Sequence, residues 1–257
     1  MSEVKDRFLI DAKDQFFIKE RIKELVKEED IIEAMLNGKV LRTTYELPNQ
    51  YGQSRWLRIL IGDVDCHRKT GVTITYKQKN EDGEETKNPI LRVEEFDHAK
   101  AFFEAMGFVE SSTQETLRTK YYVTFDKVKY IIRFDIWPGL ESLCFVTVEE
   151  ASAVNREHKE SFINQLGIAR YDIWEGHVDI DKVYLKYRGF RAMDIPELTF
   201  YANLDLQAHE NKHVQKDEGS EKLFLWLDNE ADDAARLYEL FKKSNKNLDE
   251  VIGFLNS

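Results

Sequence analysis

The sequence predicts an α+β protein whose main part is one antiparallel, barrel-like β-sheet. Eight segments show the alternation or the apolar clustering of strands, at about 3–10, 40–46, 55–61, 72–79, 89–95, 116–125, 128–136 and 143–149. Most of them follow one another closely, whereas parallel strands need crossovers of roughly a dozen residues or more. Asp126 and Lys127 separate two of these segments and predict a tight hairpin. An antiparallel sheet therefore fits the sequence better than a parallel one.

Helices are expected between and after these strands. The first is predicted at 13–27 from the helical spacing of its apolar residues. A short second helix at 29–36 would end at Asn37-Gly38 as its C-cap. Asp97 is expected to cap the start of a helix at 97–106, and Gly107 to end it. Further helices are expected at 157–166 and 180–187.

The chain is expected to consist of a main domain, residues 1–200, and a C-terminal appendage, residues 201–257. The appendage starts with a polar stretch, 209–220, and continues with a strand and two helices at about 222–227, 230–243 and 248–255. The polar stretch contains the zinc-protease pattern His-Glu-x-x-His at His209–His213. No apolar stripe accompanies this pattern, which favours a solvated loop over a metal site.

Composition limits the partners and the compartment. The formal net charge is −11 and the pI is about 5.2, which argues against a nucleic-acid coat with a basic face. No apolar run approaches the ~20 residues that span a bilayer. Cys66 and Cys144 form no Cys-x-x-Cys pair, so a reducing compartment is expected. We expect a cytoplasmic protein that associates with neither nucleic acid nor a membrane.

Charged residues share one face of several predicted strands. Arg118 and Lys120 have the same parity in one strand, Arg133 and Asp135 in the next, and Lys77 lies opposite apolar residues of its own strand. One interpretation is a sheet with one solvated side, where charge costs little. The other is a closed sheet whose charged residues face inward, which would hold an anion on the cations and a metal on the carboxylates.

Several segments, in this order and spacing, resemble a known family. They are Ser54-Arg55-Trp56-Leu57-Arg58-Ile59, Ile74-Thr75-Tyr76-Lys77, the helix that ends in Met106-Gly107-Phe108, and Asp135-Ile136-Trp137-Pro138-Gly139-Leu140. The segment 161–189, with Val183-Tyr184-Leu185-Lys186-Tyr187, belongs to the same series. Over about residues 1–200 the chain resembles the CYTH superfamily, the triphosphate tunnel metalloenzymes. This superfamily includes class IV adenylate cyclases, thiamine triphosphatases and inorganic triphosphatases.

The resemblance implies an α+β fold with a closed eight-stranded antiparallel β-barrel, the triphosphate tunnel, flanked by helices. It implies that a set of basic residues binds the triphosphate: Lys5, Arg7, Arg58, Lys77, Arg118, Lys120 and Arg133. It also implies that Mg²⁺ or Mn²⁺ is held by Glu3, Asp135 and Glu149.

The chain also departs from the pattern of this superfamily. Lys5 stands where the second Glu of the Glu-x-Glu-x-Lys signature belongs, and Thr147 replaces the first Glu of a later pair. In a middle strand, Ile90 and Arg92 occupy the positions of paired glutamates, unless a two-residue slip brings Glu94 into place. The phosphate-binding cations are thus largely retained, whereas the carboxylates are fewer.

These departures leave two functional hypotheses. The first is a metal-dependent enzyme, a triphosphatase or a class IV adenylate cyclase, in which Glu149, Glu3 and Lys77 are catalytic. The alternative is a catalytically impaired protein that binds or senses a nucleotide or polyphosphate. The expected partner is a small molecule with a triphosphate group: a nucleotide, thiamine triphosphate or a polyphosphate. The sequence leaves open whether the protein forms a homodimer.

Overall fold

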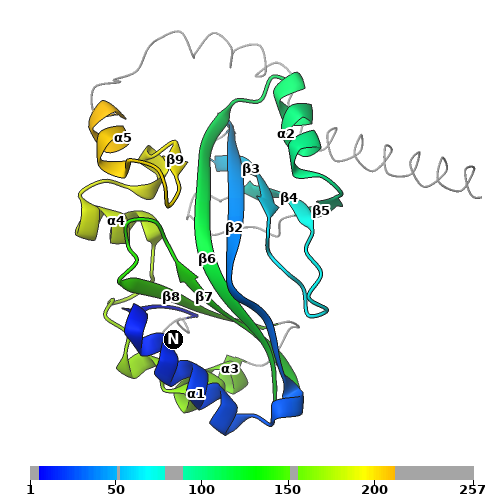
Figure 1. Cartoon of the computed structure of the whole chain (residues 1–257), viewed down its shortest axis with the longest axis vertical. Coiled ribbons are helices and arrows are strands. Elements are labelled where there is room, and N and C mark those ends of the chain that lie inside the picture. Colours follow the sequence, from blue (N-terminus) through cyan, green and yellow to red (C-terminus); the bar gives the residue numbers. More distant parts are fainter. Residues whose placement is uncertain (1–5, 51–52, 79–88, 151–155, 212–257) are drawn as a thin grey trace, which may run out of the picture. The chain divides into compact units, whose positions relative to one another are not determined.

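The computed structural model describes residues 6–50, 53–78, 89–150 and 156–211 (Figure 1). The chain divides into two compact units, Met1–Val214 and Gln215–Ser257, and all described residues belong to the first. The elements predicted at 222–227, 230–243 and 248–255, and His213 of the His-Glu-x-x-His pattern, lie outside the described residues. Residues 201–211, which were expected in the appendage, belong to the first unit and contain a helix, α5 (Leu204–Asn211).

All eight predicted strands are present in one sheet. They are β1 (Arg7–Asp11), β2 (Ile31–Gln50), β3 (Gln53–Ile61), β4 (Val72–Gln78), β5 (Ile90–Val93), β6 (Glu110–Phe125), β7 (Val128–Ile136) and β8 (Leu143–Glu150). Their order is β1-β8-β7-β6-β2-β3-β4-β5, and every pair along this path is antiparallel. A short additional strand, β9 (Glu197–Leu198), pairs in parallel with β6. The antiparallel α+β prediction is confirmed.

The sheet ends at β1 on one side and at β5 on the other. In the part of the chain that the structure describes, no ladder joins these two strands, so the path is open. The closed eight-stranded barrel therefore stays a prediction. The long strands β2 and β6 run side by side through the sheet and connect its two halves, as Figure 1 shows.

The helix predicted at 29–36 is wrong, because most of that segment belongs to β2. Asn37, expected as a helix cap, has a φ of +47° and lies where the register between β2 and β6 shifts. Its backbone N–H donates to Thr119 Oγ1 at 3.2 Å, and Thr119 Oγ1 donates to Asn37 Oδ1 at 3.0 Å. The Asn-Gly pair thus forms a bulge within a strand. In the sequence the same pair is typical of a helix end, because both features use a residue with positive φ.

The predicted hairpin at Asp126 and Lys127 is confirmed. Both residues have positive φ, +47° and +68°, as a tight two-residue turn between β6 and β7 requires. The strand β6 starts at Glu110, earlier than expected, because its first residues pair with β2. The sequence predicted the turn better than the strand end, since the turn needs particular backbone angles and the end does not.

The described helices are α1 (Gln15–Leu25), α2 (Phe96–Ala105), α3 (Arg156–Leu166), α4 (Ile180–Arg188) and α5. Short 3-10 turns occupy Ala12–Asp14, Glu28–Asp30, Ile168–Arg170 and Ala192–Asp194. The prediction for the cap of α2 is wrong: Glu95 occupies the N-cap position and Asp97 lies in the first turn. Gly107 does follow this helix with positive φ. None of the described helices is both long and apolar enough to cross a bilayer.

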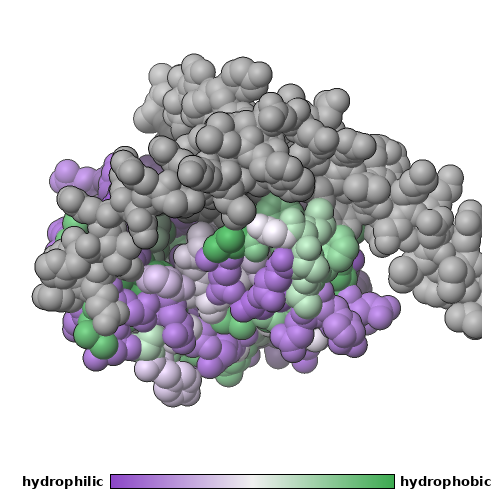
Figure 2. Space-filling view, turned by 90° about the horizontal axis from the view of Figure 1, so that it is seen from above, coloured by the Kyte–Doolittle hydropathy of each residue, from purple (hydrophilic) through white to green (hydrophobic). Residues whose placement is uncertain are grey.

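Two hydrophobic clusters hold the first unit together. One lies between the sheet and the helices α1 and α3, with Ile18 and Ile22 from α1, Phe162 from α3, and Phe134 and Val146 from the sheet. All five side chains are buried. The second joins the β7–β8 turn to α4, β9 and α5. Helices thus cover the apolar face of β1, β7 and β8 (Figure 1). The described surface in Figure 2 carries mostly hydrophilic side chains, with smaller hydrophobic areas among them.

A candidate anion-binding face

The register places the predicted cations of β1, β6 and β7 on the face opposite the apolar cluster. Directly paired residues of antiparallel strands point to the same side of a sheet. Lys120 pairs with Arg133, Arg133 with Thr147, and Thr147 with Arg7. Arg118 has the same parity as Lys120 in β6. These cations therefore share one side of this half of the sheet.

The same reasoning extends across β2, β3 and β4. Gln114, which has the parity of Arg118, pairs with Arg42 of β2. Two residues further along β2, Thr44 pairs with Arg58 of β3, and the Arg58 partner in β4 has the parity of Lys77. We call the side that these residues share the cationic face; it contains Arg7, Arg42, Arg58, Lys77, Arg118, Lys120 and Arg133.

Burial distinguishes the two interpretations of the charged strand faces. Only 5% of Arg118, 6% of Lys120 and 7% of Arg42 is exposed, and Asp135 is 8% exposed. Arg and Lys are almost never this buried unless a counter-charge accompanies them. The middle of the cationic face is thus not a solvated sheet surface, and its charges need partners in the protein or in a ligand.

Arg118 is neutralised by protein carboxylates. Its Nε and NH2 atoms donate to the two oxygens of Asp135 at 2.6 and 3.0 Å, and its NH1 atom lies 3.4 Å from Oδ1 of Asp63. Burial alone would lower the pKa of Arg118, but the two carboxylates outweigh it and raise this pKa. Burial likewise works against the charge of Asp135, yet Arg118 holds the pKa of Asp135 below its ordinary value. The Arg118–Asp135 pair is a buried, bidentate ion pair.

Lys120 and Arg133 also have protein acceptors. The Lys120 ammonium donates to Asp63 Oδ2 at 3.0 Å and to the Val64 carbonyl at 2.8 Å. Burial lowers the pKa of Lys120, although Asp63 opposes this shift. Arg133 donates to the carboxylate of Glu149. Two predicted acidic site residues, Asp135 and Glu149, are therefore engaged by arginines of the same face.

Arg42 has a different environment. Its NH2 atom donates to Thr116 Oγ1 at 2.9 Å, and its guanidinium carbon lies 4.6 Å from the ring centroid of Trp137. No carboxylate of the described residues forms an ion pair with it, and its buried Nε has no hydrogen-bond partner there. Burial, and then the charges of Arg58 and Arg118, lower the pKa of Arg42 to about 9.

The motif comparison missed Arg42 and Asp63. The nearest residues with the parity of Arg42 are the uncharged Val40 and Thr44, so a continuous charged alternation does not mark it, although Glu46 has the same parity. Asp63 follows the end of β3 and has no strand periodicity at all. The sequence does offer one signal for Arg42. It is an arginine inside the predicted strand 40–46, and the residues of opposite parity in that strand, Leu41, Thr43 and Tyr45, carry no charge.

The register gives the parity of the middle-strand residues, which a two-residue slip would leave unchanged. Arg92 pairs with Thr73 and Ile90 with Thr75, so Ile90 and Arg92 have the parity of the cationic face. Glu94 follows the end of β5. Glu94 has the same parity as Ile90 and Arg92, so the two-residue slip stays open and the departure from paired glutamates stays a prediction. Of the other predicted site residues, Glu3 and Lys5 lie outside the described residues.

The described carboxylates do not provide a metal site in this arrangement. Both oxygens of Asp135 accept hydrogen bonds from Arg118, and Glu149 accepts one from Arg133. No group of three or more His, Cys, Asp or Glu residues that could hold a metal ion occurs within the described part of the chain. Because Glu3 is outside that part, Mg²⁺ or Mn²⁺ binding stays a prediction.

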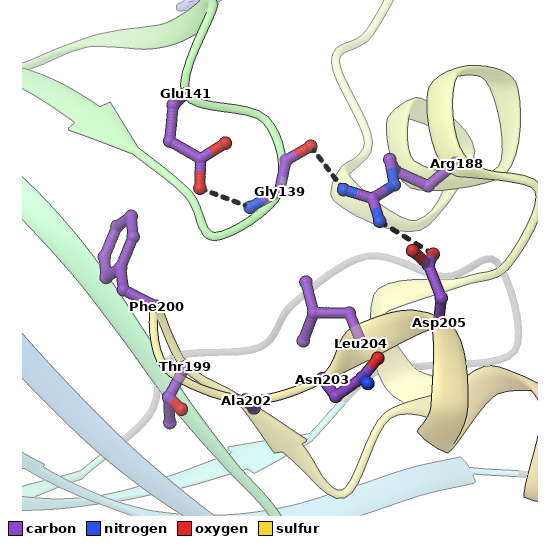
Figure 3. A pocket seen from close by; sticks show the side chains of 9 residues that line it. All are labelled: Gly139, Glu141, Arg188, Thr199, Phe200, Ala202, Asn203, Leu204 and Asp205. Atoms are coloured by element: carbon purple, nitrogen blue, oxygen red, sulfur yellow. Dashed lines mark hydrogen bonds and ion pairs between the residues drawn. The ribbon is translucent and has the colours of Figure 1, made fainter.

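A separate pocket of about 280 Å³ lies between the β7–β8 turn, α4 and the segment that leads into α5 (Figure 3). Arg188 projects into it and donates to the Gly139 carbonyl at 3.0 Å and to Asp205 at 2.7 Å, while Glu141 accepts from the Gly139 N–H at 2.7 Å. Its charged groups thus bond to each other or to the backbone of Gly139. None of the site residues predicted from the sequence lines this pocket.

Comparison with known proteins gives structural similarities only. No family model and no curated protein matches the chain. A putative adenylate cyclase from Vibrio parahaemolyticus is 12% identical, with a TM-score of 0.48 over 71% of this chain and 98% of that one. A putative adenylate cyclase from Bacillus halodurans is 13% identical, with a TM-score of 0.36 over 72% of this chain and 98% of that one. A Pyrococcus horikoshii protein is 16% identical, with a TM-score of 0.41 over 72% and 100%.

Two of these three structures are described as adenylate cyclases, one of the activities in the superfamily that the motifs resemble. At these TM-scores the similarities do not assign the chain to that superfamily. The function is therefore inferred from the register, burial and charge of the cationic face.

Proposed function

We propose that the cationic face binds the triphosphate group of a small molecule, in the manner of a divergent CYTH protein. The observation that carries the proposal is Arg42, a buried guanidinium without a carboxylate partner among the described residues. Burying a charge costs several kcal/mol or more unless a counter-charge accompanies it. An anion next to Arg42 supplies that counter-charge.

The arrangement of the cations favours an elongated anion. Arg42, Arg58 and Lys77 lie on three successive strands of the path, β2, β3 and β4. Arg118 lies on β6, which neighbours β2 on the other side, and is close enough to lower the pKa of Arg42 by its charge. A single phosphate ion contacts only a few donors, whereas a chain of phosphoryl groups reaches donors from several strands. A nucleotide, thiamine triphosphate or inorganic polyphosphate meets this requirement.

We further propose that the sheet closes around the bound triphosphate into the tunnel that the resemblance implies. The open edges of the described path are β1 and β5, and these are the strands that closure would bring together. A ligand that bridges cations of both halves of the sheet draws the halves toward each other. Protection of the backbone amides of β1 and β5 from hydrogen exchange on ligand binding tests this proposal.

The contacts of the acidic residues bear on whether a bound triphosphate is also cleaved. Asp135 and Glu149 are engaged by Arg118 and Arg133, which favours a protein that binds a triphosphate without cleaving it. Cleavage as a triphosphatase or an adenylate cyclase is the second candidate. Arg58 and Lys77 favour it, because cations of neighbouring strands on one face stabilise the charge of a transferred phosphoryl group.

The test is a combined binding and product analysis. The purified protein is titrated calorimetrically with tripolyphosphate, thiamine triphosphate and ATP, with Mg²⁺, with Mn²⁺ and with a chelator. The same mixtures are then resolved by anion-exchange chromatography. We expect saturable binding in the presence of chelator. Failure of all three compounds to bind in every mixture would contradict the proposal, and phosphate or cyclic AMP as a product would favour the second candidate.

A further inference from the structure

The segment that follows β3 turns back onto the cationic face at Gly62. This residue has a φ of +92°, and a Cβ atom there would lie 2.2 Å from the Lys39 carbonyl oxygen. Only glycine fits such a conformation at so close an approach. The turn brings the next residue, Asp63, to Arg118 and Lys120.

Asp63 occupies a position between two buried cations. Its Oδ2 atom lies 3.0 Å from Lys120 Nζ, its Oδ1 atom lies 3.4 Å from Arg118 NH1, and its side chain is largely buried. The neighbouring Val64 carbonyl accepts a second hydrogen bond from Lys120. Burial disfavours the charged carboxyl, but Arg118 and Lys120 outweigh it and hold the pKa of Asp63 below its ordinary value. A carboxylate of the protein thus holds two cations that the resemblance assigns to phosphate.

The rest of this segment has bonds of its own. Val64 and Thr70 form a β-bridge, and Asp65 Oδ1 accepts from the backbone N–H groups of His67 and Lys69 at 2.8 and 3.0 Å. The turn at 65–69 therefore does not depend on the contacts of Asp63 with the cationic face. The turn, with Cys66 in it, can therefore move away from these cations together with Asp63 and keep its internal bonds.

We propose that Asp63 is an internal anion that occupies the Arg118–Lys120 part of the cationic face and that a phosphoryl group displaces on binding. This inference rests on the proposed function and deepens it. A phosphoryl group with a charge of about −1.5 to −2 gains by replacing a single carboxylate, whereas another monoanion exchanges one charge for an equal one. Asp63 is thereby a specificity-determining residue that selects strongly charged ligands.

The first test compares Asp63→Asn with Asp65→Asn. Both substitutions remove one negative charge from the same segment, but only Asp63 contacts Arg118 and Lys120. The amide introduced by Asp65→Asn keeps an oxygen that can accept from the backbone N–H groups of the turn. In calorimetric titrations with tripolyphosphate we expect Asp63→Asn to bind about tenfold more tightly than the wild type. Asp65→Asn should stay within about twofold of the wild type.

The second test uses the unmodified protein, so it does not depend on the folding of a variant. Cys66 is partly exposed and lies in the segment that Asp63 begins, whereas Cys144 is buried. Displacement of Asp63 should expose Cys66, and saturating tripolyphosphate should then raise its rate of alkylation by N-ethylmaleimide severalfold. In Cys66→Ser the ligand-dependent alkylation should be absent, which identifies Cys66 as its site.

The outcomes separate this inference from the proposed function. If the wild type binds tripolyphosphate but Asp63→Asn binds it no more tightly, Asp63 is not a competitor and the inference fails alone. A rate of Cys66 alkylation that stays constant or falls on saturation overturns it equally. If only Asp63→Asn binds, both proposals are supported, and if neither protein binds, both fail.

Discussion

Arg118 and Arg42 lie on the same face of the sheet, on the neighbouring strands β6 and β2, and are buried to a similar extent. Arg118 has a bidentate carboxylate partner in Asp135 and a second acid in Asp63. Arg42 has a threonine hydroxyl and the ring of Trp137. Their pKa values move in opposite directions, upward for Arg118 and down to about 9 for Arg42.

The difference shows that residue type and burial alone do not make a ligand-binding residue. The charge of Arg118 is compensated by Asp135 within the protein, so loss of Asp135 should mainly affect the fold. No described carboxylate forms an ion pair with Arg42, although the charge of Asp135 partly opposes the fall of its pKa, so removal of Arg42 should mainly affect an anionic ligand. Stability and binding measurements on matched variants distinguish these two roles.

The largest expected effect is on stability and concerns the Arg118 pair. Asp135→Ala leaves the buried guanidinium of Arg118 without its bidentate partner, and we expect a loss of about 3–5 kcal/mol in the free energy of unfolding. Arg42→Met removes a buried charge that has no ion pair among the described residues, so it should stay within about 1 kcal/mol of the wild type or stabilise the protein. Urea denaturation without ligand measures both.

This stability comparison has a clear contrary outcome. If Arg42→Met loses as much stability as Asp135→Ala, then Arg42 holds the fold together and does not await an anion. Lys19→Met in α1 is not a suitable control, because Lys19 contacts the ring of Phe134 in the core. Arg156→Met in α3 is better, since its ion pair with Glu160, at 3.4 Å and on the surface, is weak.

How far the sequence predicts the molecule differs between the sheet and the site. Strand alternation identified the eight strands and placed Arg118, Lys120 and Arg133 on one side, because side-chain parity is a local property. It failed at 29–36, where apolar residues suit a helix as well as a strand and pairing with β6 decides. Asp63 could not be predicted, since its contacts depend on a turn at Gly62 and on residues 55 or more positions away.

Arg118 illustrates the limit of carrying a family role onto a single residue. The motif resemblance assigns Arg118 to phosphate and Asp135 to a metal, and the pairing of β6 with β7 places the two opposite each other. No sequence pattern shows that the two side chains bond to one another. Their mutual neutralisation is a tertiary contact, and it changes what both residues can do.

The second prediction concerns binding and is smaller. Arg42→Met should weaken tripolyphosphate binding by about ten- to a hundredfold, since a hydrogen bond to a charged group contributes about 1.5–3 kcal/mol. Arg156→Met removes the same charge from the surface and should change the affinity by less than about threefold in physiological salt. Equal effects of the two variants would mean that Arg42 contributes only to the overall charge.

The smallest expected effect is the pH dependence of binding, to which Lys120 and Arg42 both contribute because the pKa values of both are lowered. Burial lowers the pKa of Lys120 below 10.5, so the folded protein loses this proton at a lower pH than the unfolded chain. In that window the unfolded chain binds more protons, and Lys120 makes the ligand-free protein more stable as the pH rises. Anion binding requires the protonated ammonium, so the affinity for tripolyphosphate should fall over the same window.

As the pH rises, stability should increase while affinity for tripolyphosphate decreases. A surface lysine changes neither stability nor affinity below its ordinary pKa, so these opposite trends distinguish Lys120 from it. Lys120→Arg keeps the positive charge at this position, so the decline in affinity should become smaller and the part due to Arg42 should remain, while binding at neutral pH is retained. Asp63→Asn removes the neighbour that raises the pKa of Lys120, and the decline should then begin at a lower pH than in the wild type. An affinity in the wild type that stays constant up to pH 10.5 would mean that Lys120 does not contact the anion.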